Sequence, residues 1–255
     1  MTGLAALAIL AAAVFAGAIN AVVGSGSLIT FPTLLVFGFA PVVANVSNNI
    51  GLIPGNITAS VGYRKELAGQ RRRLVPLAAA SFSGALTGAI ALLALPAGVF
   101  KLVVPVLIIA GCALVIAQPK LSGWVAGQHD PDREERSGHS PVLLAGVFLT
   151  GVYGGYFGAA QGVILIGLLG VFVADSLQRI NAGKNVLVTT VNATAAVVFV
   201  IFAHVAWLAV GLIAVGSAAG GVIGAKVGRR LPPLALRIII VIIGVISAVK
   251  LIFFP

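Results

Sequence analysis

Charged residues are scarce in this sequence, and the acidic ones are the scarcest. Only 9% of the 255 residues are charged, with 6 Asp and Glu against 16 Lys and Arg, whereas 60% are hydrophobic. A soluble domain of this length cannot bury so much apolar surface, so the composition predicts a polytopic membrane protein instead. The apolar runs lack the alternation of strands, which favours helices over a barrel.

Cysteine is nearly absent as well, and catalytic motifs are missing. The single cysteine, Cys112, excludes an intrachain disulfide and is expected to pack within an apolar helix. The sequence has no Walker loop, no HExxH motif and no Ser-His-Asp arrangement. It therefore predicts no enzyme, no catalytic residue, no cofactor and no ATP-driven pump.

The six acidic residues all fall in predicted loops or at helix ends. Proton- and sodium-coupled carriers usually place Asp or Glu within the membrane, so coupling through a carboxylate is disfavoured. An ion site built from backbone carbonyls stays open. His129, Asp130 and His139 are a conceivable metal-ligand set, but their spacing fits no compact ligand pattern, and no metal site is predicted.

What the chain does contain is an internal repeat, seen when the sequence is shifted by 136 residues. The match runs without a gap from residue 45 to residue 116, which is hard to obtain by chance. In membrane proteins such repeats usually mark transporters whose site lies between the two halves. The matched polar residues are Asn45, Asn49, Asn56 and Thr58, which fall on Asn181, Asn185, Asn192 and Thr194.

Each half contains five apolar segments, and the second of them is short. These short segments, residues 26–38 and 161–173, contain too few residues to cross a hydrocarbon core of about 30 Å as helices. Each follows a break rich in small residues, at 24–27 and 158–162, so each half is predicted to begin with a broken, re-entrant hairpin. The segments lie at 3–23, 26–38, 43–62, 74–95 and 98–117, and at 141–157, 161–173, 184–202, 206–226 and 235–254.

The distribution of basic residues predicts that the two repeats are inverted. The connection at 63–74 carries five Lys and Arg, whereas its equivalent in the second half carries none, and the connection at 226–236 reverses this pattern. Because Lys and Arg favour the cytoplasmic side, loops 63–74, 118–140 and 226–236 are predicted to be cytoplasmic and both termini outside, in the cell (inner) membrane. The net charge of +10 is thereby assigned to topology and anionic lipid, not to nucleic acid.

The predicted fold is an all-α polytopic membrane protein of two inverted repeats, each with about five helical segments. The first repeat covers residues 1–117, a polar linker 118–140 and the second repeat 141–255. Small residues spaced by four predict close helix packing at Gly84 and Gly88, and at Gly216, Gly220 and Gly224.

Neutral polar residues populate the predicted membrane segments. The spacing of Asn45, Asn49 and Asn56 places them on one helix face, and their repeat equivalents share that face. Interhelical hydrogen bonding is the simpler explanation for any one of them. Both halves, however, have the same polar helix face next to the same kind of helix break, and this favours a substrate-binding site. The candidate substrate-binding residues are Ser25, Gly26, Ser27, Asn49, Gln161, Lys184 and Asn185, with Asn20, Asn45, Asn48, Asn56, Asn181 and Asn192 as secondary candidates.

The chemistry of these candidates favours an anion. A helix that begins within the membrane presents backbone N–H groups and a positive dipole end, and the segments opening at residues 26 and 161 do so. Lys184 is the only cation close to the polar set. It either supplies charge to a ligand or is a helix-start lysine that snorkels to the cytoplasmic surface.

With these residues in view, the chain resembles the sulfite exporter family TauE/SafE over nearly its whole length. The shared features are a glycine-rich break near the start of each half, a proline after it and a polar helix beyond. They are Gly17–Ser27, Phe31–Leu34 and Ala44–Asn49 in the first half, and Gly151–Gly158 and Asn181–Asn185 in the second. Two departures are a break at 24–27 that is poorer in glycine and the lack of a second-half counterpart to Pro32.

The resemblance implies export of sulfite, sulfonates or related sulfur oxyanions. The leading hypothesis is a transporter that exports such a small anion by alternating access between the inverted halves. Three alternatives stay open: an anion channel, a membrane assembly subunit without flux, and a carrier for another solute. The expected partners are the anion and the lipid bilayer, with a homodimer left open and nucleic acid excluded.

Overall fold

The computed structural model describes residues 1–127, 140–173, 175–227, 238, 240–246 and 248–249. All regular secondary structure in these ranges is helical, and five helices are long and apolar enough to cross a membrane. Residues 238, 240–246 and 248–249 are helical too. The labelled helices are α1 Gly3–Val22, α2 Ser27–Val36, α3 Pro41–Gly62, α4 Arg71–Ala94, α5 Ala97–Gly127, α6 Pro141–Tyr156, α7 Gln161–Phe172, α8 Leu177–Phe202 and α9 Trp207–Val227.

The helices follow the predicted apolar segments closely, with two differences. Helix α5 continues to Gly127, into the region predicted as a polar linker. Helix α8 begins at Leu177 rather than at residue 184, because the Ser176 side chain accepts a hydrogen bond from the Arg179 amide and caps the helix there. The candidate metal ligands at 129, 130 and 139 and the basic residues at 229, 230 and 250 lie outside the described residues.

Both predicted breaks are present, and both end the preceding helix in the same way. In α1, the amides of Val23 and Gly24 both donate to the carbonyl of Ile19, and Gly24 adopts a φ of 84°. At the end of α6, the amides of Phe157 and Gly158 both donate to the carbonyl of Tyr153, and Gly158 has a φ of 76°. Glycine permits the left-handed turn that stops each helix. The helices that follow, α2 and α7, have only 10 and 12 residues.

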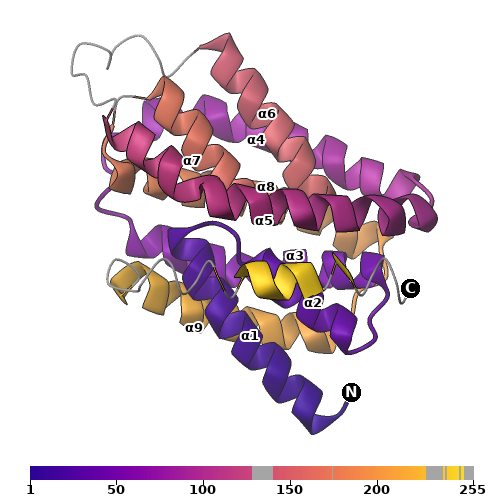
Figure 1. Ribbon diagram of the computed structural model, residues 1–255. Helices are drawn as coiled ribbons and strands as arrows, with labels where there is room; N and C mark the ends of the chain where they lie inside the picture. The colour runs from indigo at the N-terminus through magenta and orange to yellow at the C-terminus, as the bar shows by residue number, and fades with distance from the viewer. Residues whose placement is uncertain (128–139, 174, 228–237, 239, 247, 250–255) are drawn as a thin grey trace.

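The helices assemble into two bundles that do not coincide with the sequence halves. Helix α9 packs against α1 and α3, and helix α4 packs against α6 and α8. We define the first bundle as α1, α2, α3 and α9, and the second as α4, α6, α7 and α8, with α5 against α7. Figure 1 shows α4, α6 and α7 in the upper part of the view and α1, α2 and α9 in the lower part. Thus α4 of the first half lies in the second bundle, and α9 of the second half lies in the first.

Equivalent glycines make the close contacts inside each bundle. A Cβ at Gly220 would lie 2.0 Å from the carbonyl oxygen of Val14, and a Cβ at Gly84 would lie 2.2 Å from that of Phe148. Gly220 and Gly84 are partners in the repeat, and Val14 and Phe148 each lie ten residues before the glycine of their break. The prediction of close packing at these small residues is confirmed.

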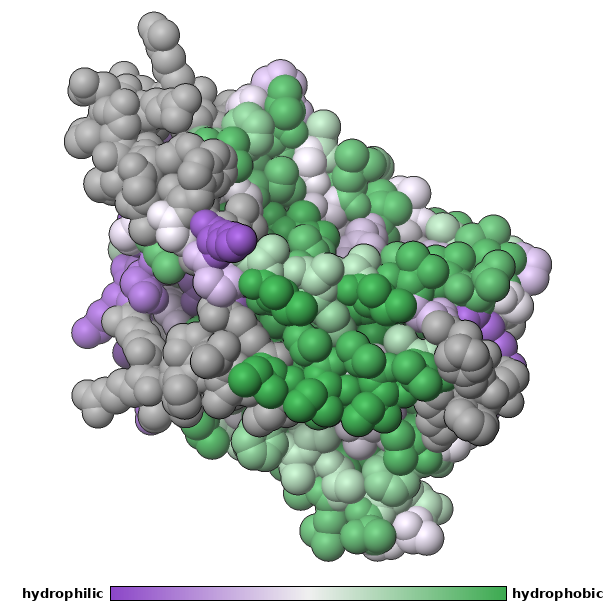
Figure 2. All heavy atoms as spheres, viewed as in Figure 1, coloured by the Kyte–Doolittle hydropathy of each residue, from purple (hydrophilic) through white to green (hydrophobic). Residues whose placement is uncertain are grey.

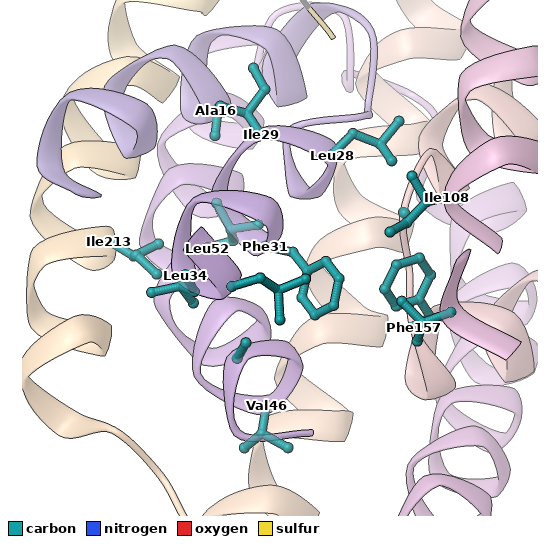
Figure 3. Packing of buried hydrophobic residues seen from close by; sticks show 14 of the residues in the cluster. Ala16, Leu28, Ile29, Phe31, Leu34, Val46, Leu52, Ile108, Phe157 and Ile213 are labelled. Carbon is teal, nitrogen blue, oxygen red and sulfur yellow. The ribbon is translucent and has the colours of Figure 1, made fainter. Parts of the chain in front are cut away.

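Apolar side chains fill the interior and also cover much of the surface. Figure 2 shows hydrophobic residues across the middle of one face, with hydrophilic residues toward its edges. In the interior, Phe31 of α2 meets Phe157 of the second break edge to face, with ring centroids 5.2 Å apart (Figure 3). Cys112 is buried in the same apolar cluster, which confirms its predicted packing role.

Candidate functional site

The carboxyl end of α1 is bound by one face of α8. The side-chain amides of Asn181 and Asn185 donate to the carbonyl of Ala21 at 3.0 and 3.3 Å, and the ammonium of Lys184 donates to the carbonyl of Asn20 at 2.9 Å. The spacing of three and four residues puts these three donors on one face of α8. Carbonyls at a helix end lack partners within the helix, and the negative end of the dipole favours a cation there.

Lys184 is fully buried, with 0% of its surface exposed. The snorkelling interpretation is therefore wrong: α8 begins at Leu177, so Lys184 lies two turns inside the helix instead of at its start. An ammonium has three N–H donors, and within the described chain the Asn20 carbonyl is its one hydrogen-bond partner. Asp175, the acidic residue just before α8, is engaged with Arg73 and Arg179.

Asn20 joins three helices at the first break. Its side-chain amide nitrogen donates to the side-chain oxygen of Asn56 at 2.7 Å, and its own side-chain oxygen accepts from the backbone N–H of Gly26 at 3.0 Å. Gly26 was predicted to offer that N–H to a ligand. In this structure it is already engaged, and the bond fixes the start of α2 to the end of α1.

Several buried polar atoms near the first break have no hydrogen-bond partner among the described residues. They are the hydroxyl of Ser25, the amide nitrogen of Asn56 and the amide oxygen of Asn181. Ser27, half-buried, begins α2 beside them. Leaving a buried polar group unpaired costs about 1–3 kcal/mol, so each such group calls for a reason. They belong to the first break or to residues bonded to it, as Asn56 is to Asn20 and Asn181 is to Ala21, and a ligand at this break can satisfy them.

Gln161 lies at the second break, apart from Lys184. The two breaks touch there, since the backbone N–H of Gly162 donates to the carbonyl of Gly24 at 3.1 Å. A Cβ at Gly24 would lie 2.5 Å from the Cα of Gly162, so neither residue can carry a side chain in this arrangement. The predicted single group of binding residues is therefore divided between two neighbouring breaks.

The family model of the sulfite exporters TauE/SafE matches residues 9–251. The chain belongs to this family. It is a membrane transporter and not a member of an enzyme family. No solved structure matches the chain.

Curated relatives of this TauE/SafE protein carry transporter names. It is 26% identical over 247 residues to "Probable membrane transporter protein YfcA" of Escherichia coli K12, covering 94% of this chain and 87% of the relative. It is 27% identical over 236 residues to "Probable membrane transporter protein" of Haemophilus influenzae, covering 92% and 89%. It is 27% identical over 252 residues to "Probable membrane transporter protein ORF9" of Sinorhizobium sp., covering 96% and 91%.

The remaining asparagine candidates of the TauE/SafE protein connect helices. The amide of Asn49 donates to the Asn192 oxygen at 3.4 Å, which joins α3 to α8. Asn45 donates to the carbonyl of Tyr156 at the end of α6, much as Asn181 does at the end of α1. Asn48 accepts from the hydroxyl of Thr30. Interhelical hydrogen bonding is therefore present for Asn45, Asn48 and the pair Asn49 and Asn192.

Charge distinguishes the two breaks. Asn48 is the repeat equivalent of Lys184 and is neutral, so the ammonium is present at the first break alone. Two further polar groups were not among the candidate site residues: Thr30, the partner of Asn48, and Tyr153, whose hydroxyl donates to the carbonyl of Ala159 and secures the second break. Their positions in the sequence, close to the glycine-rich breaks, could have identified them.

Among the described residues, no three His, Cys, Asp or Glu side chains gather as a metal site would require.

Proposed function

We propose that this protein exports a small anion, namely sulfite or a related sulfur oxyanion or organosulfonate. The observation that carries the proposal is the ammonium of Lys184, which is fully buried and has a backbone carbonyl, not a carboxylate, as its partner in the described chain. Removing a charge from water costs several kcal/mol unless an opposite charge or good hydrogen bonds compensate it. The carbonyl of Asn20 compensates only part of that cost. A bound anion would supply the rest.

The neutral groups around Lys184 suit the same ligand. Amides and hydroxyls donate hydrogen bonds to an oxyanion without the repulsion that a carboxylate would add. The unpaired hydroxyl of Ser25 and the unpaired amide nitrogen of Asn56 are such donors. The family's name supports a sulfur oxyanion as the chemical class.

Transport is proposed to run outward across the cell's inner membrane without a coupling ion. A potential that is negative inside favours the exit of a monovalent anion by about 2.3 kcal/mol per 100 mV. The proposed orientation places the α3–α4 loop and the α7–α8 connection on the cytoplasmic side. The contact between Arg73 and Asp175, at 3.0 Å, supports this by joining those two connections on one side of the molecule.

Alternating access is proposed to occur between the two bundles rather than between the sequence halves. Within each bundle, glycines bring helices into backbone contact, as at Gly220 and Gly84. Between the bundles, apolar contacts such as Phe31 with Phe157 stand beside polar ones, in which Lys184 of the second bundle reaches Asn20 of the first. Polar contacts can exchange partners as bundles separate, whereas tight glycine packing resists shear. The direct contact of Gly24 with Gly162 favours this carrier over a permanently open channel.

Ligand binding to the purified protein tests the proposal. Sulfite, thiosulfate, sulfoacetate and sulfate are added in turn, with chloride as control, and the thermal midpoint is recorded. We expect stabilisation by at least one sulfur oxyanion, which Lys184→Met abolishes because the buried charge is removed. Lys226→Met is the matched control, since Lys226 is an exposed lysine in the last turn of α9. Stabilisation by none of these anions, or equal stabilisation of Lys184→Met, would overturn the assignment.

A further inference from the structure

Gln161, the first residue of α7, has an unsatisfied side chain in the interior of the protein. Its surface is 2% exposed, and neither its amide nitrogen nor its amide oxygen has a hydrogen-bond partner among the described residues. A primary amide can donate two hydrogen bonds and accept two more. Burying one without partners opposes folding, so the position is not explained by stability.

The Gln161 amide can lie where it does because residue 154 is glycine. A Cβ at Gly154 would lie 1.9 Å from the Gln161 amide oxygen and 2.7 Å from Cγ1 of Val191. The amide thus lies over α6 beside α8. Gly154 stands four residues before Gly158, as Asn20 stands four residues before Gly24. At the first break the Asn20 side chain accepts from the backbone N–H of Gly26, at the start of the next helix. At the second break the Tyr153 hydroxyl bonds the Ala159 carbonyl, and the Gln161 side chain stays without a partner among the described residues.

We propose that the Gln161 amide, at the start of α7, forms a second, neutral binding site for the transported oxyanion. This inference rests on the proposed function and extends it to the other break. The amide N–H groups donate to an oxyanion, and the amino-terminal end of the 12-residue helix α7 adds its positive dipole. The two sites are expected to differ in binding strength, because Lys184 gives the first a charge whereas its repeat equivalent, Asn48, is neutral.

The geometry makes the two sites consecutive positions on one path. Lys184 and Val191 are seven residues apart on α8, which is two turns or about 10 Å along the axis. Between them the backbone of Gly162 contacts that of Gly24. An anion moving from Lys184 to Gln161 must part this contact. A weaker second site then favours release, since conduction needs binding that is weak enough to leave.

Gln161→Leu separates this role from a structural one. Leucine has a similar volume and removes the two unpaired atoms, so the thermal midpoint of the full-length protein without ligand should rise. Sulfite flux in proteoliposomes should fall about tenfold or more, because a hydrogen bond to a charged ligand is lost. Sulfite binding at Lys184, measured by thermal stabilisation, should persist within about threefold.

Asn45→Leu is the matched control, because it makes the same kind of change at an amide that is paired with the Tyr156 carbonyl. Its thermal midpoint should fall. Gln161→Glu should lower flux further than Gln161→Leu by repelling the anion. Unchanged flux in Gln161→Leu, or a fall in both flux and thermal midpoint, would overturn the second site. Failure of the wild-type protein itself to bind or move sulfite would overturn the proposed function together with this site, and it is seen before any variant is made.

Discussion

The ammonium of Lys184 on α8 donates a hydrogen bond of 2.9 Å to the backbone carbonyl of Asn20 at the end of α1. In many carriers with broken helices, a sodium ion or proton is coordinated at such a carbonyl end. Here a covalently attached cation from the other bundle occupies that position, with the amides of Asn181 and Asn185 beside it. A protein arranged in this way has no need of a separate coupling cation at the first break.

Transport should therefore follow the membrane potential and ignore sodium. For a monovalent anion, a potential of 100 mV should sustain a concentration ratio of about 50-fold, the equivalent of about 2.3 kcal/mol. The measurement is sulfite uptake into proteoliposomes with an imposed potassium diffusion potential, with sodium replaced by choline in a parallel set. A ratio that tracks the sodium gradient, or that is unaffected by the potential, would contradict this prediction.

Gly220→Ala should destabilise the first bundle. The new methyl group would lie 2.0 Å from the carbonyl oxygen of Val14, so α1 and α9 must move apart. Overpacking of this kind costs about 1–3 kcal/mol. Thermal unfolding in detergent gives the measurement, and Gly211→Ala on the same helix is the control, since a Cβ there meets no atom within 4 Å. Equal midpoints for the two variants would show that α1 and α9 are not closely packed.

Hydropathy and charge predicted most of the helices because lipid imposes strong rules on apolar length. The short segments at 26–38 and 161–173 became α2 and α7, and the glycines at 24 and 158 supplied the breaks. The exchange of α4 and α9 between bundles was not predictable in the same way. Which helices pack together depends on which glycine-rich helix faces meet. Hydropathy shows that a segment is a membrane helix but not which other helix it packs against.

The candidate residues were largely found, but their arrangement was not. Lys184 was interpreted as close to a helix end because the apolar segment begins there, whereas the capping serine at 176 adds two polar turns before it. Asn20 and Asn56 ranked as secondary candidates, yet they form the junction of α1, α2 and α3. Asn45 and Asn181 bind equivalent helix ends, whereas the equivalent pair Asn49 and Asn185 has different partners, the Asn192 side chain and the Ala21 carbonyl.

Asp175→Asn should loosen the connection between the α3–α4 loop and α8. Its carboxylate pairs with Arg73 at 3.0 Å and with Arg179 at 2.9 Å, and asparagine would leave two guanidinium groups close together without compensation. We expect a loss of about 1–3 kcal/mol at low salt and a smaller loss in concentrated salt, where like charges are screened. Thermal midpoints at two ionic strengths give the test. Arg72→Gln, at an exposed neighbour, is the control, and a salt-independent loss would contradict the explanation.

Joining the two bundles covalently should stop transport. Ser60 of α3 and Thr189 of α8 lie on opposite bundles with their hydroxyl oxygens 3.4 Å apart. In a Cys112→Ala background, Ser60→Cys with Thr189→Cys should form a disulfide on oxidation, abolish sulfite flux and regain it on reduction. The controls are the single variants Ser60→Cys and Thr189→Cys in the same background, which cannot form this disulfide. Each should keep its flux under the same oxidation. If the disulfide between Ser60→Cys and Thr189→Cys forms fully and flux continues, the bundles do not separate at this face. Alternating access would then have to occur by another movement, such as displacement of the short helices α2 and α7 alone.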